Sequence, residues 1–331
     1  MKKVHVSTFV LSLSSLLVGY LMTLTPSLSA TSTNHPIETS FIAEAPLPDP
    51  VPAFDINVLP LAVPAKSVTR LEDLQDTVLQ SKLDAIINSN KHWAATAKNK
   101  TLNIGIVDMS DPLNARFAAI NPDNMVYAAS LPKIAVLLAS QEAIEQGKFT
   151  ETAEVKADMR MMIAKSSNPA ATRMINRVGL KEIGTTMKSY DLYNIENGGG
   201  LWVGKAYGGS NGRIGDPLKN LSHAASVMQV CKYYYKLAFG QLVSKEGSKN
   251  MLNILVNPEL HHKFVSVLDR VAPEAKVYRK SGTWENWHTD SALVWDTDRK
   301  YIVVALAQDA AGESILRELM AQIDKALVVK S

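Results

Sequence analysis

Cysteine is almost absent from this sequence of 331 residues, which contains only Cys231. A single cysteine excludes an intrachain disulfide, and its distance from the N-terminus excludes a lipid-modified terminal cysteine. A chain of this length with 46% apolar residues buries enough surface to need no covalent cross-link. We therefore expect a large apolar core, in one large or two modest domains, with Cys231 as a small buried side chain within it.

A block of one charge is also missing. The 35 basic and 32 acidic residues are mixed along the chain and give a formal net charge of only +3. This balance, without a block of lysine or arginine, does not suggest a nucleic acid as partner, so we expect a small molecule or a peptide. The histidines His261, His262 and His288 do not have the spacing to carboxylates that is typical of zinc sites, and we expect no metal or other cofactor.

The N-terminal 30 residues have the three zones of a secretory signal. Met1-Lys2-Lys3 gives a positive start, residues 9–24 are mostly apolar, and residues 26–30 offer small side chains to a peptidase. We expect an exported protein, periplasmic or secreted. Because Leu28 is a poor residue at the inner cleavage position, an uncleaved signal acting as a membrane tether is the alternative.

Residues 31–66 contain seven prolines among small and polar residues, which predicts an extended linker, because proline can neither continue a helix nor donate to a sheet. Structure is expected to begin near Leu71, so that 67–331 form the folded domain. Apolar periodicity predicts helices from Leu71 for about 20 residues and over 130–147, 155–165, 170–178, 181–189, 222–239 and 312–327. It predicts strands over 101–108, 116–120, 276–282, 291–296 and 301–307.

This order of elements predicts an α+β fold with α/β/α layers. The simplest packing is a five-stranded antiparallel sheet flanked by the N- and C-terminal helices, with a helical lobe of about 130–272 inserted into it.

One stretch combines a serine with a lysine one helical turn later. Ser130 stands at the expected start of an apolar helix, and Lys133 follows on the same face. A serine hydroxyl needs an adjacent base to act as a nucleophile, and burial against residues 134–139 would favour the neutral amine of Lys133. The same helix start offers free backbone N–H groups to an oxyanion. By itself the pattern is equally typical of a serine that caps an ordinary helix.

Two further stretches add to this one. Ser166-Ser167-Asn168-Pro169 lies between two expected helices, where Asn168 would be a good N-cap. Lys280-Ser281-Gly282-Thr283 lies on an expected strand, where Gly282 would let another backbone or a ligand approach closely.

Together, the three stretches resemble the three motifs of the penicillin-recognising serine hydrolases, most closely the class A β-lactamases. The resemblance covers about residues 71–327 and implies a β-lactamase/transpeptidase-like fold. It implies that Ser130 is acylated, that Lys133 is the base or part of it, and that Ser166 relays a proton to the leaving nitrogen. Asn168 would hold the amide side chain of the substrate, Lys280, Ser281 and Gly282 would bind its carboxylate end, and the N–H groups of Ser130 and Thr283 would form the oxyanion hole.

The sequence departs from the family pattern in three ways. The first and second motifs are closer together than in the usual enzymes, so a trimmed helical lobe is expected. Two motif residues also differ, of which Ser281 in place of threonine keeps the hydroxyl, and the third departure concerns a loop. Ser167 replaces the aspartate of the second motif, and the Glu-x-x-x-Asn loop that activates the deacylating water is not found. The corresponding stretch, 196–211, is rich in glycine and has Glu196 as its only carboxylate. It is either a surface loop or a flap with Trp202 and Tyr207 as substrate contacts.

The expected function is acyl transfer from a β-lactam or a D-Ala-D-Ala-type peptidoglycan peptide to Ser130. The alternatives are a D,D-carboxypeptidase or penicillin-binding protein with slow deacylation, a glutaminase or esterase on the same scaffold, and a catalytically idle module that binds the cell wall.

Overall fold

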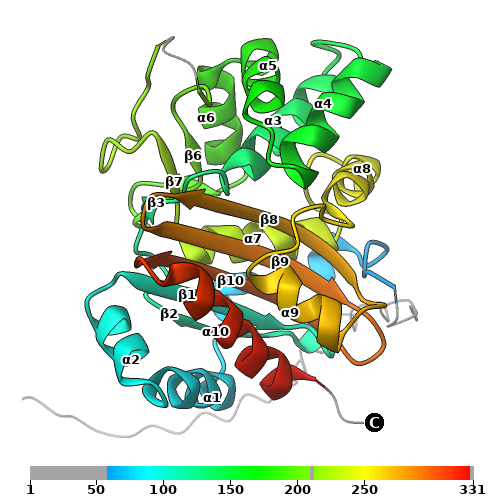
Figure 1. Cartoon of the computed structure of the whole chain (residues 1–331). Helices are drawn as coiled ribbons and strands as arrows, with labels where there is room; N and C mark the ends of the chain where they lie inside the picture. The colour runs from blue at the N-terminus through cyan, green and yellow to red at the C-terminus, as the bar shows by residue number, and fades with distance from the viewer. Residues whose placement is uncertain (1–57, 209–211, 329–331) are drawn as a thin grey trace, which may run out of the picture. The chain divides into compact units, whose positions relative to one another are not determined.

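A five-stranded antiparallel sheet forms the centre of the protein (Figure 1). The structure is a computed structural model that describes residues 58–208 and 212–328. The strand order is β2-β1-β10-β9-β8, so that β8, which carries the third motif, is an edge strand. The strands are β1 (Leu102–Asp108), β2 (Arg116–Ile120), β8 (Lys276–Trp284), β9 (Trp287–Trp295) and β10 (Lys300–Gln308). The expected sheet and the α+β fold class are confirmed.

Successive residues of the inner strands enter two separate cores. On β10, Val303 and Ala305 belong to one apolar cluster, whereas Ile302 and Val304 belong to the other. The sheet is therefore covered on both faces, which explains why its inner strands are almost continuously apolar.

Helices from both ends of the chain cover one face, and a middle helix covers the other (Figure 1). The first group comprises α1 (Thr77–Asn88), α2 (Lys91–Lys98), α9 (Phe264–Val271) and α10 (Gly312–Leu327). The opposite face carries α7 (Val227–Ala238), and Cys231 is fully buried there, as expected.

The helical part above β8 is built around α3 (Lys133–Glu145), which is buried on nearly all sides. The helices around it are α4 (Ala153–Ala164), α5 (Asn168–Val178), α6 (Leu180–Ser189) and α8 (Lys245–Leu255). A small sheet of β3 (Val126–Tyr127), β7 (His223–Ala225) and β6 (Trp202–Val203) lies beside the start of α3, and β4 (Tyr193–Asn194) pairs with β5 (Gly199–Gly200). Three short 3₁₀ turns complete the structure: η1 (Ala65–Ser67), η2 (Leu71–Asp73) and η3 (Pro112–Asn114).

The prediction of one 20-residue helix from Leu71 is wrong. Leu71 lies in η2, Gln75 then forms a bridge to Phe117, and α1 begins only at Thr77. The reason is the side chain of Asp76, which accepts a hydrogen bond from the N–H of Leu79 at 2.7 Å and caps the new helix.

The start of the folded part also differs from the expectation. Val63 is buried in the core and Leu61 packs against it, so structure begins before Leu71. The predicted helix 222–239 opens as strand β7, and α8 and α9 were not predicted. The proposed signal, 1–30, and most of the linker lie outside the described residues. None of the helices within residues 58–208 and 212–328 combines the length and apolar character needed to cross a bilayer.

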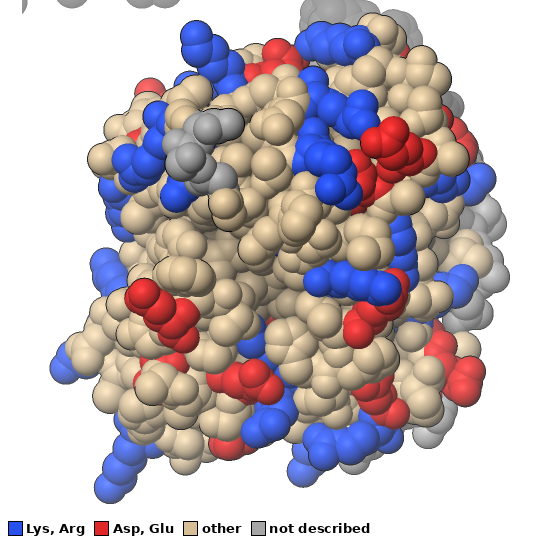
Figure 2. All heavy atoms as spheres, turned by 45° about the horizontal axis from the view of Figure 1, so that its top comes forward, with Lys and Arg blue, Asp and Glu red and all other residues tan. Residues whose placement is uncertain are grey.

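Basic and acidic side chains alternate over the face drawn in Figure 2, without a continuous area of either sign. A hollow lies near the centre of this face.

Candidate active site

Ser130 lies in a tight turn immediately before α3. The turn is closed by hydrogen bonds from Leu131 N to Ala128 O at 3.1 Å and from Lys133 N to Ser130 O at 3.2 Å. Ala129 has a φ of +50°, a left-handed conformation that is costly for a residue with a Cβ. The helix itself begins at Lys133, three residues later than expected, but the serine and the lysine still share one turn.

Lys133 is fully buried and joins the first two motifs. Its Nζ lies 3.1 Å from Ser130 Oγ, 2.6 Å from Ser166 O and 2.8 Å from Asn168 Oδ1. The carbonyl oxygens of Ser166 and Asn168 can only accept hydrogen bonds, whereas a hydroxyl can also donate. A neutral amine would use its two N–H groups on these carbonyls, and its lone pair would then remain for the hydroxyl of Ser130.

The surroundings of Lys133 favour this neutral form. Burial lowers the pKa of Lys133 to about 7, and within the described residues no carboxylate forms an ion pair with it. The amine also lies over the ring of Tyr207, with Nζ 4.4 Å from the ring centroid. Tyr207 is itself held by a hydrogen bond from its hydroxyl to Ala129 O at 3.3 Å.

Ser166 connects Lys133 to the third motif. Its Oγ accepts a hydrogen bond from Lys280 Nζ at 2.9 Å and lies 3.4 Å from Lys133 Nζ. Ser166 has a φ of +55°, which turns its hydroxyl and its carbonyl toward the two amines. Burial, followed by the charge of Lys133, lowers the pKa of Lys280 well below its usual value. The structure thus brings Ser130, Lys133, Ser166 and Lys280 into one hydrogen-bonded chain.

Ser167, which stands where the family motif has an aspartate, caps a helix. Its Oγ accepts a hydrogen bond from Ala170 N at 3.3 Å and caps α5, so the N-cap is Ser167 and not Asn168. Asn168 is exposed, and its Nδ2 donates to no acceptor within the described part of the chain. The side-chain N–H groups of Asn168 are therefore available to a ligand.

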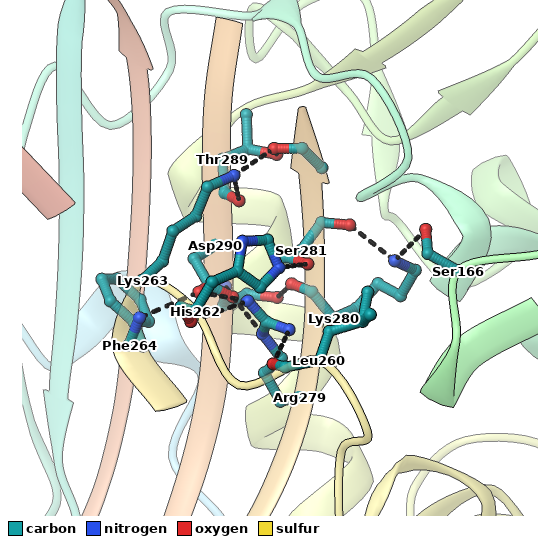
Figure 3. Close-up of polar contacts among 12 residues, drawn as sticks. Ser166, Leu260, His262, Lys263, Phe264, Arg279, Lys280, Ser281, Thr289 and Asp290 are labelled. Atoms are coloured by element: carbon teal, nitrogen blue, oxygen red, sulfur yellow. Dashed lines mark hydrogen bonds and ion pairs between the residues drawn. The ribbon is translucent and has the colours of Figure 1, made fainter. Parts of the chain in front are cut away.

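The glycine of the third motif, Gly282, lies against the backbone of Ser130. A Cβ on Gly282 would lie 2.6 Å from Ala128 O and 2.7 Å from Ser130 N, so only glycine lets β8 approach this closely. Thr283 lines the cleft in front of Ser130. Ser281 is buried and points the other way, with its Oγ 3.4 Å from His262 Nε2 (Figure 3).

The sequence did not indicate Lys263, whose amine is hydrogen-bonded to the end of β8. This lysine is fully buried, has a φ of +52°, and donates hydrogen bonds to Gly282 O at 2.6 Å and Thr283 Oγ1 at 2.7 Å. Burial lowers the pKa of Lys263 to about 8. Figure 3 shows its amine beside Thr289, at the end of the strand pair. Nothing in the sequence His261-His262-Lys263 signals that its third residue is buried.

A buried ion pair fixes the same region. Arg279 and Asp290 face each other across β8 and β9, with Nε to Oδ1 at 2.7 Å and Nη2 to Oδ2 at 2.8 Å. Arg279 also donates to Leu260 O at 3.0 Å, which ties the segment before α9 to the sheet (Figure 3). Two planar groups joined by two hydrogen bonds hold a fixed geometry, and this pair links the strand that carries the third motif to β9.

A cleft of about 290 Å³ opens in front of Ser130. Its lining includes aromatic rings, one lysine and the backbone around Ser130, from Tyr127, Ala129, Ser130, Asn168, Lys205, Ala206, Tyr207, Gly208, Ser222, His223, Thr283 and Trp284. Of the two aromatic residues expected as contacts from the glycine-rich stretch, Tyr207 borders the cleft. Trp202 does not border it and is buried, donating to Ile214 O.

Glu196 lies away from this cleft. It borders a different hollow, together with Arg70, Glu72 and Asp123. The residues that line the cleft in front of Ser130 include no aspartate or glutamate. Among the residues that the structure describes, no glutamate from another part of the chain therefore replaces the missing loop glutamate in this cleft.

His261 and His262 each contact a nearby side chain. His261 is exposed and pairs with Asp269 at 2.8 Å, and His262 contacts Ser281. Within residues 58–208 and 212–328, no three potential metal ligands gather at one point.

The fold is similar to that of solved β-lactamases and penicillin-binding proteins. The β-lactamase from Sphaerobacter thermophilus superposes with a TM-score of 0.60 at 16% identity, covering 75% of this chain and 97% of that one. PBP-A superposes with a TM-score of 0.54 at 17% identity, covering 76% and 96%. A PBP-A variant solved as an acyl-enzyme complex with penicillin G gives 0.53 at 17% identity, covering 76% and 97%.

The sequence itself matches a protein-family model. A model of the β-lactamase enzyme family matches residues 153–330, more than half of the chain, and so the chain belongs to that family. The matched part contains the second and third motifs, and Ser130 and Lys133 precede it. No curated protein matches the chain in sequence.

Proposed function

We propose that this β-lactamase-like hydrolase forms an acyl-enzyme on Ser130 with an amide substrate, either a β-lactam or a D-Ala-D-Ala-type peptidoglycan peptide. The hydrogen-bonded chain from Ser130 through Lys133 and Ser166 to Lys280 supports this proposal most strongly. The chain consists of two hydroxyl groups and two amines at distances over which a proton can be transferred, which is what acyl transfer to a serine needs.

In the proposed acylation, Ser130 Oγ attacks the amide carbonyl and its proton passes to the neutral amine of Lys133. The C–N bond then breaks, and the hydroxyl of Ser166 gives its proton to the leaving nitrogen while it takes one from Lys133. Lys280 stabilises Ser166 and attracts the carboxylate of the substrate. Ser130 N and Thr283 N are the proposed donors to the oxyanion, and Gly282 allows the two strands to approach.

The proposed hydrolysis of the acyl-enzyme is slow. A water molecule must lose a proton to attack the ester, and no carboxylate of the described residues borders the cleft to accept it. The space beside Lys133 is occupied by the ring of Tyr207. This observation favours a penicillin-binding or D,D-carboxypeptidase activity with a long-lived adduct over rapid β-lactam hydrolysis.

Export to the periplasm or the outside belongs to the same proposal, since peptidoglycan peptides are found there. Its basis is the signal-like sequence of residues 1–30.

Labelling with a fluorescent penicillin tests the proposal. We expect the wild-type protein to be labelled and the Ser130→Ala variant not to be labelled. A glutaminase or esterase on this scaffold would instead cleave glutamine or a small ester through Ser130 without labelling. An idle binding module would show no labelling and unchanged binding of cell-wall fragments in Ser130→Ala.

A further inference from the structure

The loop side of the cleft carries a lysine whose charge has no partner. Lys205 is partly buried and borders the cleft that contains Ser130. Within the described residues, its amine forms no hydrogen bond or ion pair, and no carboxylate lines the same cleft. A cation in such a cleft is available to an anionic ligand.

The backbone around Lys205 is fixed, so its side chain starts from a defined point. His223 Nε2 donates a hydrogen bond to Lys205 O at 3.0 Å. In the preceding residue, Gly204 N donates to Ser222 O, and Gly204 O accepts from Ile214 N, each at 2.7 Å. A Cβ on Gly204 would lie 1.9 Å from Ile214 O, which makes this close contact specific to glycine. A fixed starting point lets a long side chain recognise a ligand group at a defined place in the cleft.

Lys205 and Lys280 act on different sides of the nucleophile. Lys280 lies on β8, and its Nζ donates to Ser166 Oγ at 2.9 Å, while Ser166 O accepts from Lys133 Nζ at 2.6 Å. Lys205 instead lies beside His223, which donates to its carbonyl at 3.0 Å, in the lining of the cleft, to which Lys280 does not contribute. An extended substrate lying across Ser130 would therefore meet one cation beyond its leaving group and another beyond its acyl group.

We propose that Lys205 is a specificity-determining residue that binds a second carboxylate, on the acyl side of the substrate. The substrate class is then an amide with two anionic ends, of which Lys280 attracts one and Lys205 the other. This inference rests on the proposed acylation of Ser130 and narrows its substrates.

Two penicillins that differ by one carboxylate provide the probe. Benzylpenicillin has an uncharged side chain, and α-carboxybenzylpenicillin carries an additional carboxylate on the same side chain. The measurement is the second-order rate constant for adduct formation with each compound, followed by intact-protein mass spectrometry, and the quantity compared is the ratio of the carboxylated to the uncharged compound.

We expect this ratio to fall about fivefold in Lys205→Gln and roughly twentyfold in Lys205→Glu, where attraction becomes repulsion. The matched control is Lys181→Gln, which removes the same charge from an exposed position of α6 outside the cleft. It should leave the ratio as in the wild type. In the wild type alone, added salt should lower the ratio, because it screens exposed charges.

An unchanged ratio in both Lys205 variants would overturn the inference while leaving the acylation of Ser130 intact. If neither penicillin forms an adduct on Ser130 of the wild type, the proposed function fails, and this inference fails with it.

Discussion

The two sides of the cleft differ in the chemistry that they offer to a bound amide. The motif side consists of Ser130, Asn168 and Thr283, with Lys133, Ser166 and Lys280 directly behind them. The loop side consists of Lys205, Ala206, Tyr207 and Gly208. Proton donors and acceptors are concentrated on the motif side, whereas the loop side contributes a cation and an aromatic ring. Under the proposed function, the motif side would supply the groups for acylation, and the loop side supplies no carboxylate that could serve as a base for hydrolysis.

The largest expected effect comes from removing the amine of the motif side. Lys133→Met keeps the length of the side chain and takes away the proposed base, so we expect adduct formation with benzylpenicillin to slow roughly a thousandfold. The rate is measured by mass spectrometry at several penicillin concentrations. A rate within threefold of the wild type would show that Lys133 is not the base. Lys181→Met, on the exposed side of α6, is the control.

A smaller effect is expected from separating β8 from the nucleophile. In Gly282→Ala, the new methyl group would meet Ala128 O, Ser130 N and Thr289 Oγ1, all within 2.7 Å, and one of the two segments must shift. Since a displacement of about 1 Å at a reacting group costs on the order of a hundredfold in rate, we expect a loss of that size in acylation. Thermal unfolding distinguishes it from loss of the fold. Wild-type acylation by a folded variant would mean that the close approach has no catalytic role.

The pH dependence of acylation tests the protonation state of Lys133. Only the neutral amine can accept the proton of Ser130, and burial lowers the pKa of Lys133 to about 7. The acylation rate should therefore rise about tenfold per pH unit below this value and level off above it. A rate that is flat from about pH 5 to pH 9 would contradict a lysine base.

The smallest expected effect concerns the stability of the fold. Burial lowers the pKa of Lys133 to about 7 and that of Lys263 to about 8, below the value of about 10.4 in an unfolded chain. Between these values the unfolded chain binds more protons than the folded one, so both lysines make the free energy of unfolding rise with pH from about 7 to 10. Urea unfolding at both ends of this window measures the rise. It should be smaller in Lys263→Met, and an equal rise would show that Lys263 is not buried as an amine.

The sequence was sufficient for those parts of the site that local patterns encode. The apolar strands and the helix 312–327 follow from periodicity, and Gly282 follows from its place on a strand beside a lysine. The contact between Lys280 and Ser166 joins residues more than a hundred positions apart, and only the resemblance of the three motifs made it predictable.

The missed features depend on tertiary packing. Lys263 is buried because α9 and β8 close over it, and a lone lysine after two histidines carries no sign of this. The position of Tyr207 over Lys133 likewise results from the fold of a glycine-rich stretch with no regular period. The start of α1 could have been predicted from Asp76, whose position before an apolar helix is typical of an N-cap.

The lifetime of the benzylpenicillin adduct tests the central claim, that the motif side acylates while the loop side offers no base for hydrolysis. After brief exposure and removal of free penicillin, intact-protein mass spectra are recorded over time. The account predicts one adduct, absent in Ser130→Ala, that persists far longer than it took to form. Rapid penicillin turnover with no accumulating adduct would contradict it.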